Sequence, residues 1–313
     1  MLSVTPKEAE LVKNPLTCRA KIETVAALRD RVITQLDPDY PPLLKAIHDP
    51  PLVLHFRGRK ELLTKPAIAV VGSRQASPYG VNAADEIARW IVNAGLGVVS
   101  GLARGVDAAA HTSTLDAGGS AVAVLGNGID IVYPRDNAPL YRRLEEEGVI
   151  VTELAPGRPP RRENFPVRNR IIAGLTLGTV IVEATGRSGS LITARLANEQ
   201  GREVFVVPGS IFAPGSEGPH RLAQCGAKLI HDVDDILHEL RDEFQPAGHE
   251  PPPLPDSPLR EVLQALSREE GRHFDHLAQA VGGSPGSLSQ VLLELEIDGW
   301  IRALPGSRWV RLK

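Results

Sequence analysis

From residue 66 onward, short runs of apolar and β-branched residues alternate with longer stretches in which apolar residues recur at helical spacing. Almost every residue of the short runs is apolar, as expected of strands that helices cover on both faces. Strands that alternate with helices of about 10 to 14 residues predict a parallel, doubly wound α/β sheet. The expected strands are residues 67–71, 97–100, 121–125, 149–154, 179–184 and 203–207, and the expected crossover helices are residues 81–94, 106–117, 137–147, 167–176 and 191–200.

The predicted sheet domain covers residues 39–243. A strand at 227–230 and a helix at 233–240 close it, and residues 52–56 predict an added edge strand ahead of it. Residues 1–38 form a short and weakly patterned N-terminal extension, in which we expect one amphipathic helix around residues 22–36.

The C-terminal part of the chain predicts a second, smaller domain. Residues 244–256 are rich in proline and predict an extended linker. Residues 257–313 then show three short helical patterns followed by a hairpin with Pro305 and Gly306 at its turn, and this order is typical of a winged helix. The expected helices are residues 259–266, 274–281 and 287–297, and the expected hairpin strands are residues 300–303 and 308–312.

Composition narrows the class of protein. The chain is 42% hydrophobic, which excludes disorder, and it has no run of the roughly 18 apolar residues that a membrane-spanning helix needs. The first residues carry charges where a signal peptide is apolar, so we expect a cytoplasmic protein. The two cysteines, Cys18 and Cys225, have no CxxC or paired-histidine context, which argues against a disulfide framework or a zinc site.

Glycine-rich loops follow three of the expected strands, at residues 72–74, 100–107 and 186–190. Ligands of open parallel sheets bind where the strands end. Glycine lets the backbone approach a ligand, the next helix offers free N–H groups, and an arginine in each loop supplies positive charge, which together suit phosphate. The sequence contains neither the GxxxxGK[ST] motif of P-loop proteins nor a GxGxxG with a later acidic residue, which is the dinucleotide-binding motif. The phosphate ligands that remain are a mononucleotide and a nucleic-acid backbone.

The formal charge of the chain is −3, yet its arginines gather in one place. Of its 35 basic residues 27 are arginine, which suits bidentate phosphate contacts but also reflects the codon bias of a GC-rich genome. Residues 157–170 carry five arginines against the single Glu163 and place Phe165 in their midst. A basic track with an aromatic platform is typical of a binding site for single-stranded nucleic acid.

The candidates for catalysis are few. His111 has the pattern of a packed histidine, Asp107 is expected to cap the helix that follows it, and Glu153 and Glu183 stand at strand ends. No carboxylate cluster suits two-metal chemistry, so the sequence favours a binding protein over an enzyme. The expected recognition helix of the winged domain has no Lys or Arg, which favours a regulatory or protein-contact role, with Arg302, Arg308 and Arg311 of the wing as a modest DNA surface.

The motifs AIAVVGSRQASPYG, VVSGLARGVDAAAH, AVLGNGIDIVYP, NFPVRNRIIAG and SGSLITARLANEQGREVFVVPGS closely resemble the DprA/Smf family (DNA-processing protein A). The resemblance implies an extended Rossmann-like fold that binds and protects single-stranded DNA, forms a homodimer, and helps to load the RecA recombinase in natural transformation. It implies no enzymatic activity and no metal or cofactor. The binding residues implied by the motifs are Gly72, Ser73, Arg74, Gly101, Arg104, Asp107, Arg162, Phe165, Arg168, Asn169, Arg170, Ser188, Gly189 and Ser190.

Two alternatives stay open at this point. Related Rossmann-like folds bind small nucleotides at the same edge, with a strand-end glutamate as catalyst, and Glu183 holds that place. The chain could also act chiefly as an adaptor through its winged domain. Residues 1–38 are too short for the helical N-terminal domain of many family members, so the contribution of that domain is in doubt here.

Overall fold

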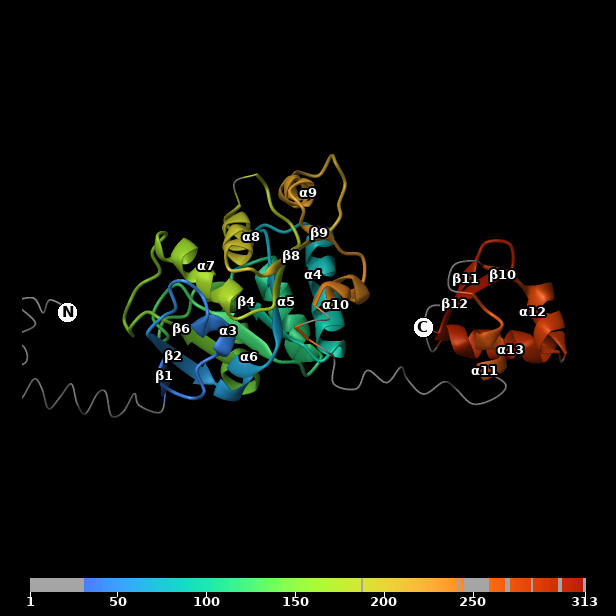
Figure 1. Ribbon diagram of the computed structural model, residues 1–313, viewed down its shortest axis with the longest axis horizontal. Coiled ribbons are helices and arrows are strands. Elements are labelled where there is room, and N and C mark those ends of the chain that lie inside the picture. The colour runs from blue at the N-terminus through green and yellow to red at the C-terminus, as the bar shows by residue number, and fades with distance from the viewer. Residues whose placement is uncertain are drawn as a thin grey trace, which may run out of the picture. The chain divides into compact units, whose positions relative to one another are not determined.

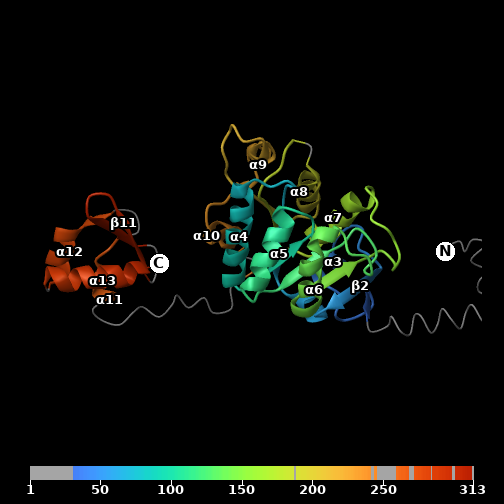
Figure 2. The same ribbon diagram turned by 180° about the vertical axis from the view of Figure 1, so that it is seen from behind.

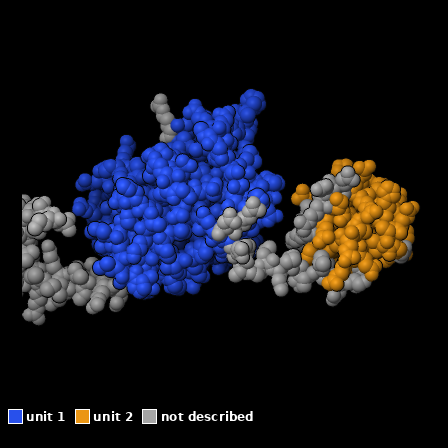
Figure 3. Space-filling view, in the orientation of Figure 1, with its two compact units in different colours: residues 1–246 blue, residues 247–313 orange. Residues whose placement is uncertain are grey.

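The computed structural model describes residues 31–186, 188–240, 243–244, 259–267, 271–282, 284–297 and 300–311. The chain divides into two compact units, residues 1–246 and 247–313, which are coloured separately in Figure 3. Residues 1–30 of the expected N-terminal extension, Cys18 among them, and residues 245–256 of the expected linker lie outside the described residues. In the described part of the chain, no helix is long and apolar enough to cross a membrane.

Unit 1 is built on a nine-stranded sheet in the order β1-β2-β6-β5-β4-β3-β7-β8-β9 (Figure 1). The strands β3 to β9 run parallel, and β1 and β2 are antiparallel additions next to β6. The predicted doubly wound, Rossmann-like fold is confirmed. The strands are β1 (Val32–Thr34), β2 (Val53–Gly58), β3 (Ala67–Val71), β4 (Gly97–Ser100), β5 (Ala121–Val124), β6 (Val149–Thr152), β7 (Gly178–Ile181), β8 (Glu203–Val206) and β9 (Lys228–Leu229).

Helices cover both faces of the sheet (Figures 1 and 2). In β3, Ala67, Ala69 and Val71 pack into one core while Ile68 and Val70 pack into the other, because successive side chains of a strand point to opposite faces. Burial of each large aliphatic side chain stabilises the fold by about 1.5 to 3 kcal/mol. One face carries α4 (Pro78–Asn93), α5 (Val106–Asp116), α6 (Ala138–Glu147) and α10 (Val233–Leu240), and the other carries α3 (Pro42–Lys45), α7 (Asn164–Gly174), α8 (Gly189–Glu199) and α9 (Glu217–Gln224).

The N-terminal side of the sheet differs from the sequence prediction. The strand expected at residues 52–56 is present as β2, but it is not the edge of the sheet, because β1 pairs with its outer side. We expected a helix around residues 22–36. This prediction is wrong for residues 32–34, which form β1, and residues 22–30 lie outside the described residues. A three-residue strand with one buried side chain, Ile33, is held by its backbone pairing with β2, and no local pattern reveals that pairing.

Several helices also differ from the prediction: α4 begins three residues earlier than expected, and α3 was not predicted. Helix α7 begins three residues earlier than expected and includes Phe165 and Pro166, since proline fits the first turn of a helix, where its missing N–H is not needed. Helix α9, preceded by a short 3-10 turn at Pro214–Ser216, was not predicted at all.

Unit 2 is a winged helix, as predicted. Its core contains Leu263, Leu277, Leu292, Leu295 and Trp300. The strand β10, which the sequence pattern did not reveal, completes a three-stranded sheet in the order β10-β12-β11. The elements are α11 (Leu259–Gln264), β10 (Arg272–His273), α12 (Phe274–Val281), α13 (Pro285–Ile297), β11 (Ile301–Leu304) and β12 (Arg308–Arg311).

Candidate functional site

The predicted site residues come from loops and helix starts at the edge where the parallel strands end, here called the carboxyl edge. The loop at 72–77 follows β3, the loop at 101–105 follows β4, and the loop at 182–188 follows β7, while residues 153–163 join β6 to α7. Because β4, β3 and β7 pair in parallel as neighbours, the three glycine loops meet at this edge. Arg187 of the third loop lies outside the described residues.

Arg168 of α7 lies beneath these loops rather than on the surface. Its side chain is buried, and its Nη1 donates hydrogen bonds to the carbonyl oxygen of Gly101, at 3.0 Å, and to that of Val124. Burial lowers the pKa of Arg168 to about 10, so the guanidinium stays charged at neutral pH. A Cβ on Gly101 would lie 2.6 Å from Nη2 of Arg168, which explains why this position requires glycine. Arg168 therefore fastens the loop after β4 and the last residue of β5 to α7.

Asp107 shapes the loop that precedes its helix. Its Oδ2 accepts hydrogen bonds from the backbone N–H of Gly101, at 3.1 Å, and of Ala103, at 3.3 Å. Burial raises the pKa of Asp107, against the opposing effect of Arg168. Asp107 was expected to cap α5 and its dipole. The capping role is wrong, because Gly105 is the N-cap and the carboxylate bonds to the loop, but Asp107 does lie in the first turn of α5, where a negative charge favours the helix dipole.

Phe165 is the centre of a cluster of aromatic rings and cations. Its ring is half-buried and lies 5.6 Å from the ring of Tyr133, centroid to centroid. The guanidinium carbons of Arg74 and Arg168 lie 5.2 Å and 5.9 Å from the Phe165 centroid. A Cβ on Gly126 would lie 2.8 Å from the ring, so this glycine makes room for it. Sequence reasoning missed Tyr133 and Gly126, although both belong to the AVLGNGIDIVYP motif.

The remaining predicted arginines differ in whether they form ion pairs with carboxylates. Arg74 and Arg162 are exposed, and within the described residues neither forms an ion pair with a carboxylate. Arg104 is exposed too, and its Nη2 lies 2.6 Å from a carboxylate oxygen of Asp136.

Arg170 is bound to carboxylates. Its side chain is 14% exposed and forms two hydrogen bonds with Glu153, of 2.6 and 3.1 Å, and one with Asp49, of 3.2 Å. Burial alone lowers the pKa of Arg170, but these hydrogen bonds outweigh it and raise the pKa. Arg170 thus joins α7 to the end of β6, and its predicted contact with phosphate needs it to exchange partners.

Ser188, Gly189 and Ser190 form the start of α8. Ser188 is the N-cap, and its Oγ lies 2.7 Å from Oγ of Ser190 and accepts the N–H of Ser190 at 3.4 Å. The side-chain amide of Asn169 donates to the carbonyl oxygen of Gly189 at 3.3 Å, which links this helix start to α7. A helix N-terminus with free N–H groups and partial positive charge favours an anion. In the loop after β3, the carbonyl oxygen of Ser73 accepts the N–H of Val106, and Gly72 packs against the Val106 side chain.

The strand-end glutamate and the histidine that could have been catalytic are both held by the fold. Glu183 is buried and accepts hydrogen bonds from the N–H of Ser77, at 2.9 Å, and from its hydroxyl, at 2.5 Å. Ser77 is in turn the N-cap of α4, so Glu183 fixes the start of that helix. Burial lowers the pKa of His111 to about 3, so this imidazole is neutral at neutral pH.

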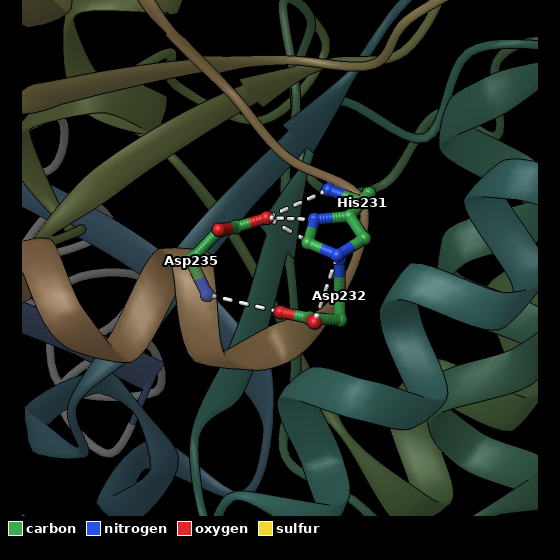
Figure 4. Close-up of side chains that lie close together, drawn as sticks. All are labelled: His231, Asp232 and Asp235. Carbon is green, nitrogen blue, oxygen red and sulfur yellow. Dashed lines mark hydrogen bonds and ion pairs between the residues drawn. The ribbon is translucent and has the colours of Figure 1, made fainter. Parts of the chain in front are cut away.

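Within the described residues, one group of three side chains has the composition of a metal site: His231, Asp232 and Asp235 (Figure 4). Its hydrogen bonds are those of a helix start. Asp232 accepts the N–H of Asp235 at 3.1 Å, while Asp235 accepts the N–H of His231 at 2.8 Å and lies 2.7 Å from Nδ1 of the same histidine. These reciprocal contacts explain the cluster as the cap of α10.

The fold and this edge define an extended Rossmann-like α/β protein with a C-terminal winged helix. The family model for "DNA recombination-mediator protein A" matches residues 31–241, and that for the "DprA winged helix domain" matches residues 245–307. The chain belongs to the DprA/Smf family.

Individual relatives agree with this assignment. The chain is similar to Protein Smf of Escherichia coli, with 42% identity over 88% of this chain and 75% of the relative. Among solved structures it is similar to DNA processing protein A of Streptococcus pneumoniae, with 39% identity, a TM-score of 0.66, and coverage of 74% of this chain and 83% of the other. It is also similar to DNA processing protein A of Helicobacter pylori, a structure described for its single-stranded DNA binding mode, with 27% identity, a TM-score of 0.61, and coverage of 68% and 97%.

Proposed function

We propose that this chain binds single-stranded DNA at the carboxyl edge and acts as a recombination mediator rather than an enzyme. One observation carries the proposal: Phe165 stands among Arg74, Arg168 and Tyr133 at the carboxyl edge, beside the loops that follow β3 and β5. An aromatic ring stacks on any base, and cations along the track neutralise the backbone, so the pair suits a single strand without sequence preference. The description of the Helicobacter pylori relative supports the same ligand class.

The residues of the edge have separate roles in this proposal. The exposed part of the Phe165 ring stacks a base, and the phosphates next to it meet Arg74 and Arg162, whose charges are not used by carboxylates in the described structure. The positive end of the α8 dipole at Ser188–Ser190 favours a further phosphate, which takes the N–H of Ser190 from its 3.4 Å contact with Oγ of Ser188. Arg104 reaches a phosphate by leaving Asp136, since an exposed ion pair is worth only about 0 to 1 kcal/mol.

The buried members of the set act as positioning residues. Arg168 and Asp107 hold the first half of the 101–105 loop. Arg168 bonds to the carbonyl oxygen of Gly101, and Asp107 bonds to the N–H groups of Gly101 and Ala103. Asn169 links α7 to the start of α8, and Arg170 links it to β6. Because these bonds exist without DNA, the edge keeps its shape before the strand arrives, which reduces the ordering cost of binding.

Single-stranded and duplex oligonucleotides distinguish this proposal directly. In a gel shift across a salt series, we expect single strands to bind more tightly than duplex, with affinity that falls steeply as salt rises, because phosphate contacts release counterions. Equal affinity for both, or binding that ignores salt, contradicts the proposal.

Delivery of the strand to RecA is the further step. We propose that the bound chain protects the strand and hands it to RecA, and that the chain works as a homodimer. The exposed edge strand β9, with Leu229 53% exposed, supports self-association, since an unpaired strand edge is a template for pairing. Sedimentation equilibrium tests the dimer, and the lag of RecA filament formation with and without this chain tests the hand-over. An unchanged lag contradicts it.

A further inference from the structure

The large hydrophobic side chains that unit 1 exposes lie on one edge. In its described residues, every one of them belongs to a loop after a parallel strand, to the first turn of a helix that follows such a loop, or to the ends of β1, β2 and β9 beside them. All of these places are at the carboxyl edge. Single exposed apolar side chains are ordinary, whereas adjacent ones that form a contiguous patch mark a binding surface. Phe165 and its neighbours occupy only a part of this edge.

The most exposed aromatic side chain of this edge is at the tip of the loop after β8. Ile211 is 80% exposed and Phe212 is 89% exposed. The base of this loop, residues 208–216, is nevertheless anchored. The Tyr79 hydroxyl donates to the carbonyl oxygen of Pro208 at 2.6 Å, and the N–H of Ala184 donates to that of Gly215 at 2.7 Å. The fold therefore presents two apolar side chains to solvent on a fixed base.

A hollow of about 370 Å³ lies between this tip and α9. Ile211, Phe212 and Pro214 form its apolar wall, while His220, Arg221 and Gln224 of α9 form a polar wall, in which Nε2 of His220 lies 3.1 Å from the carbonyl oxygen of Gly209. The acidic residue of the lining, Glu217, is already paired with Arg221 at 2.7 Å and accepts the N–H of Gly186 at 3.1 Å. The hollow thus joins the glycine loop at 186–190, and Figures 1 and 2 show the loops before α8 and α9 rising side by side.

We propose that Phe212, with Ile211 beside it, is a second base-stacking site for single-stranded DNA. The inference rests on the proposed function and extends it. A base has an apolar face and a polar rim, which match the two walls of the hollow, and its phosphates pass the start of α8 on the way from Phe165. Phe165 contacts the loops after β3 and β5, and β8 is two strands beyond β3 in the sheet, so the second site lies about 10 Å or more further along the edge.

This spacing makes the second site dependent on the length of the strand. At about 3.4 Å per nucleotide of a stacked strand, a dinucleotide held at Phe165 falls short of a site about 10 Å away and leaves Phe212 unoccupied, whereas a strand of about 15 nucleotides reaches both. We expect Phe212→Ala to weaken binding of the longer strand by about 5- to 150-fold and to leave the shorter strand unaffected, and Phe212→Trp to restore the longer strand's affinity. Leu36→Ala is the matched control, because Leu36 is equally exposed but lies at the opposite end of the same edge, after β1.

Fluorescence anisotropy with both strand lengths and the full chain tests the inference. Phe165→Ala, measured alongside, separates the two proposals. If this variant loses affinity for both strand lengths, the main site is supported whatever the affinity of Phe212→Ala. Unchanged affinity of Phe212→Ala for the longer strand overturns the second site alone, and so does a loss seen in Leu36→Ala instead. If Phe212→Ala changes the sedimentation mass but not DNA binding, the tip contacts another copy of the chain and the inference is wrong.

Discussion

Replacement of Arg168 by alanine tests whether the carboxyl edge is organised from below. The substitution leaves the carbonyl oxygens of Gly101 and Val124 without their donor, and each buried, unsatisfied acceptor costs about 1 to 3 kcal/mol. It also removes the larger of the two positive charges that act on the buried Asp107 and leaves only that of Arg74. Removal of a buried guanidinium returns part of this cost, because the charge no longer has to be desolvated. We expect unit 1 to lose about 2 to 5 kcal/mol of unfolding free energy.

Native-state hydrogen exchange measures this loss within unit 1 alone. The amides of β5 are buried at the centre of the sheet, so their slowest exchange reports global unfolding of this unit and is not affected by the winged helix. Arg162→Ala is the matched control, since it removes the same side chain type from an exposed position of the adjoining loop and should change stability by less than about 0.5 kcal/mol. The reasoning is refuted if Arg168→Ala exchanges as slowly as the control.

Three further outcomes follow from the same contacts. Gly126→Ala should push the Phe165 ring aside, cost about 1 to 3 kcal/mol in stability and weaken DNA binding, as measured by denaturant unfolding and anisotropy. Arg74→Ala should reduce the salt slope of single-strand binding by about 0.7, and an unchanged slope speaks against its phosphate contact. The hydrogen bond with Asp235 raises the pKa of His231 above 6.5. Burial acts to raise the pKa of Asp235, but the hydrogen bonds from His231 outweigh burial and lower that pKa below 3.8. The His231 contribution to α10 is therefore complete below pH 6.5 and lost as pH rises through its folded pKa, and the Asp235 contribution is present above pH 3.8 and lost as pH falls through its folded pKa. An NMR titration of His231 that gives the same pKa in Asp235→Asn contradicts this pairing.

The sheet and the winged helix could be predicted because their signals are local. Strands buried on both faces are apolar throughout, as β3 and β5 show, and helices between them have their own periodicity. Three glycine loops could be placed on one edge because parallel strands all end on the same side. By contrast β1 depends on its pairing with β2, a contact between residues about 20 positions apart that leaves no periodic pattern.

The finer structure of the site was only partly visible in the sequence. An arginine in a basic segment is usually exposed, and Arg168 was therefore expected on the surface. A signal did exist: Arg168 stands three and four residues before Ile171 and Ile172, both buried, so it shares their face of α7. The contact between Phe165 and Tyr133 has no such signal, because it joins the first turn of α7 to the loop after β5.

The most direct test of the account is the affinity of Phe165→Ala for a single-stranded oligonucleotide, measured by anisotropy beside Val167→Ala. Val167 is exposed two residues further along α7, but its aliphatic side chain cannot stack on a base. The account predicts that Phe165→Ala weakens binding by about 1 to 3 kcal/mol while Val167→Ala binds like the unmodified chain. Equal affinities of the two variants would contradict the assignment of Phe165 as the stacking platform at the carboxyl edge.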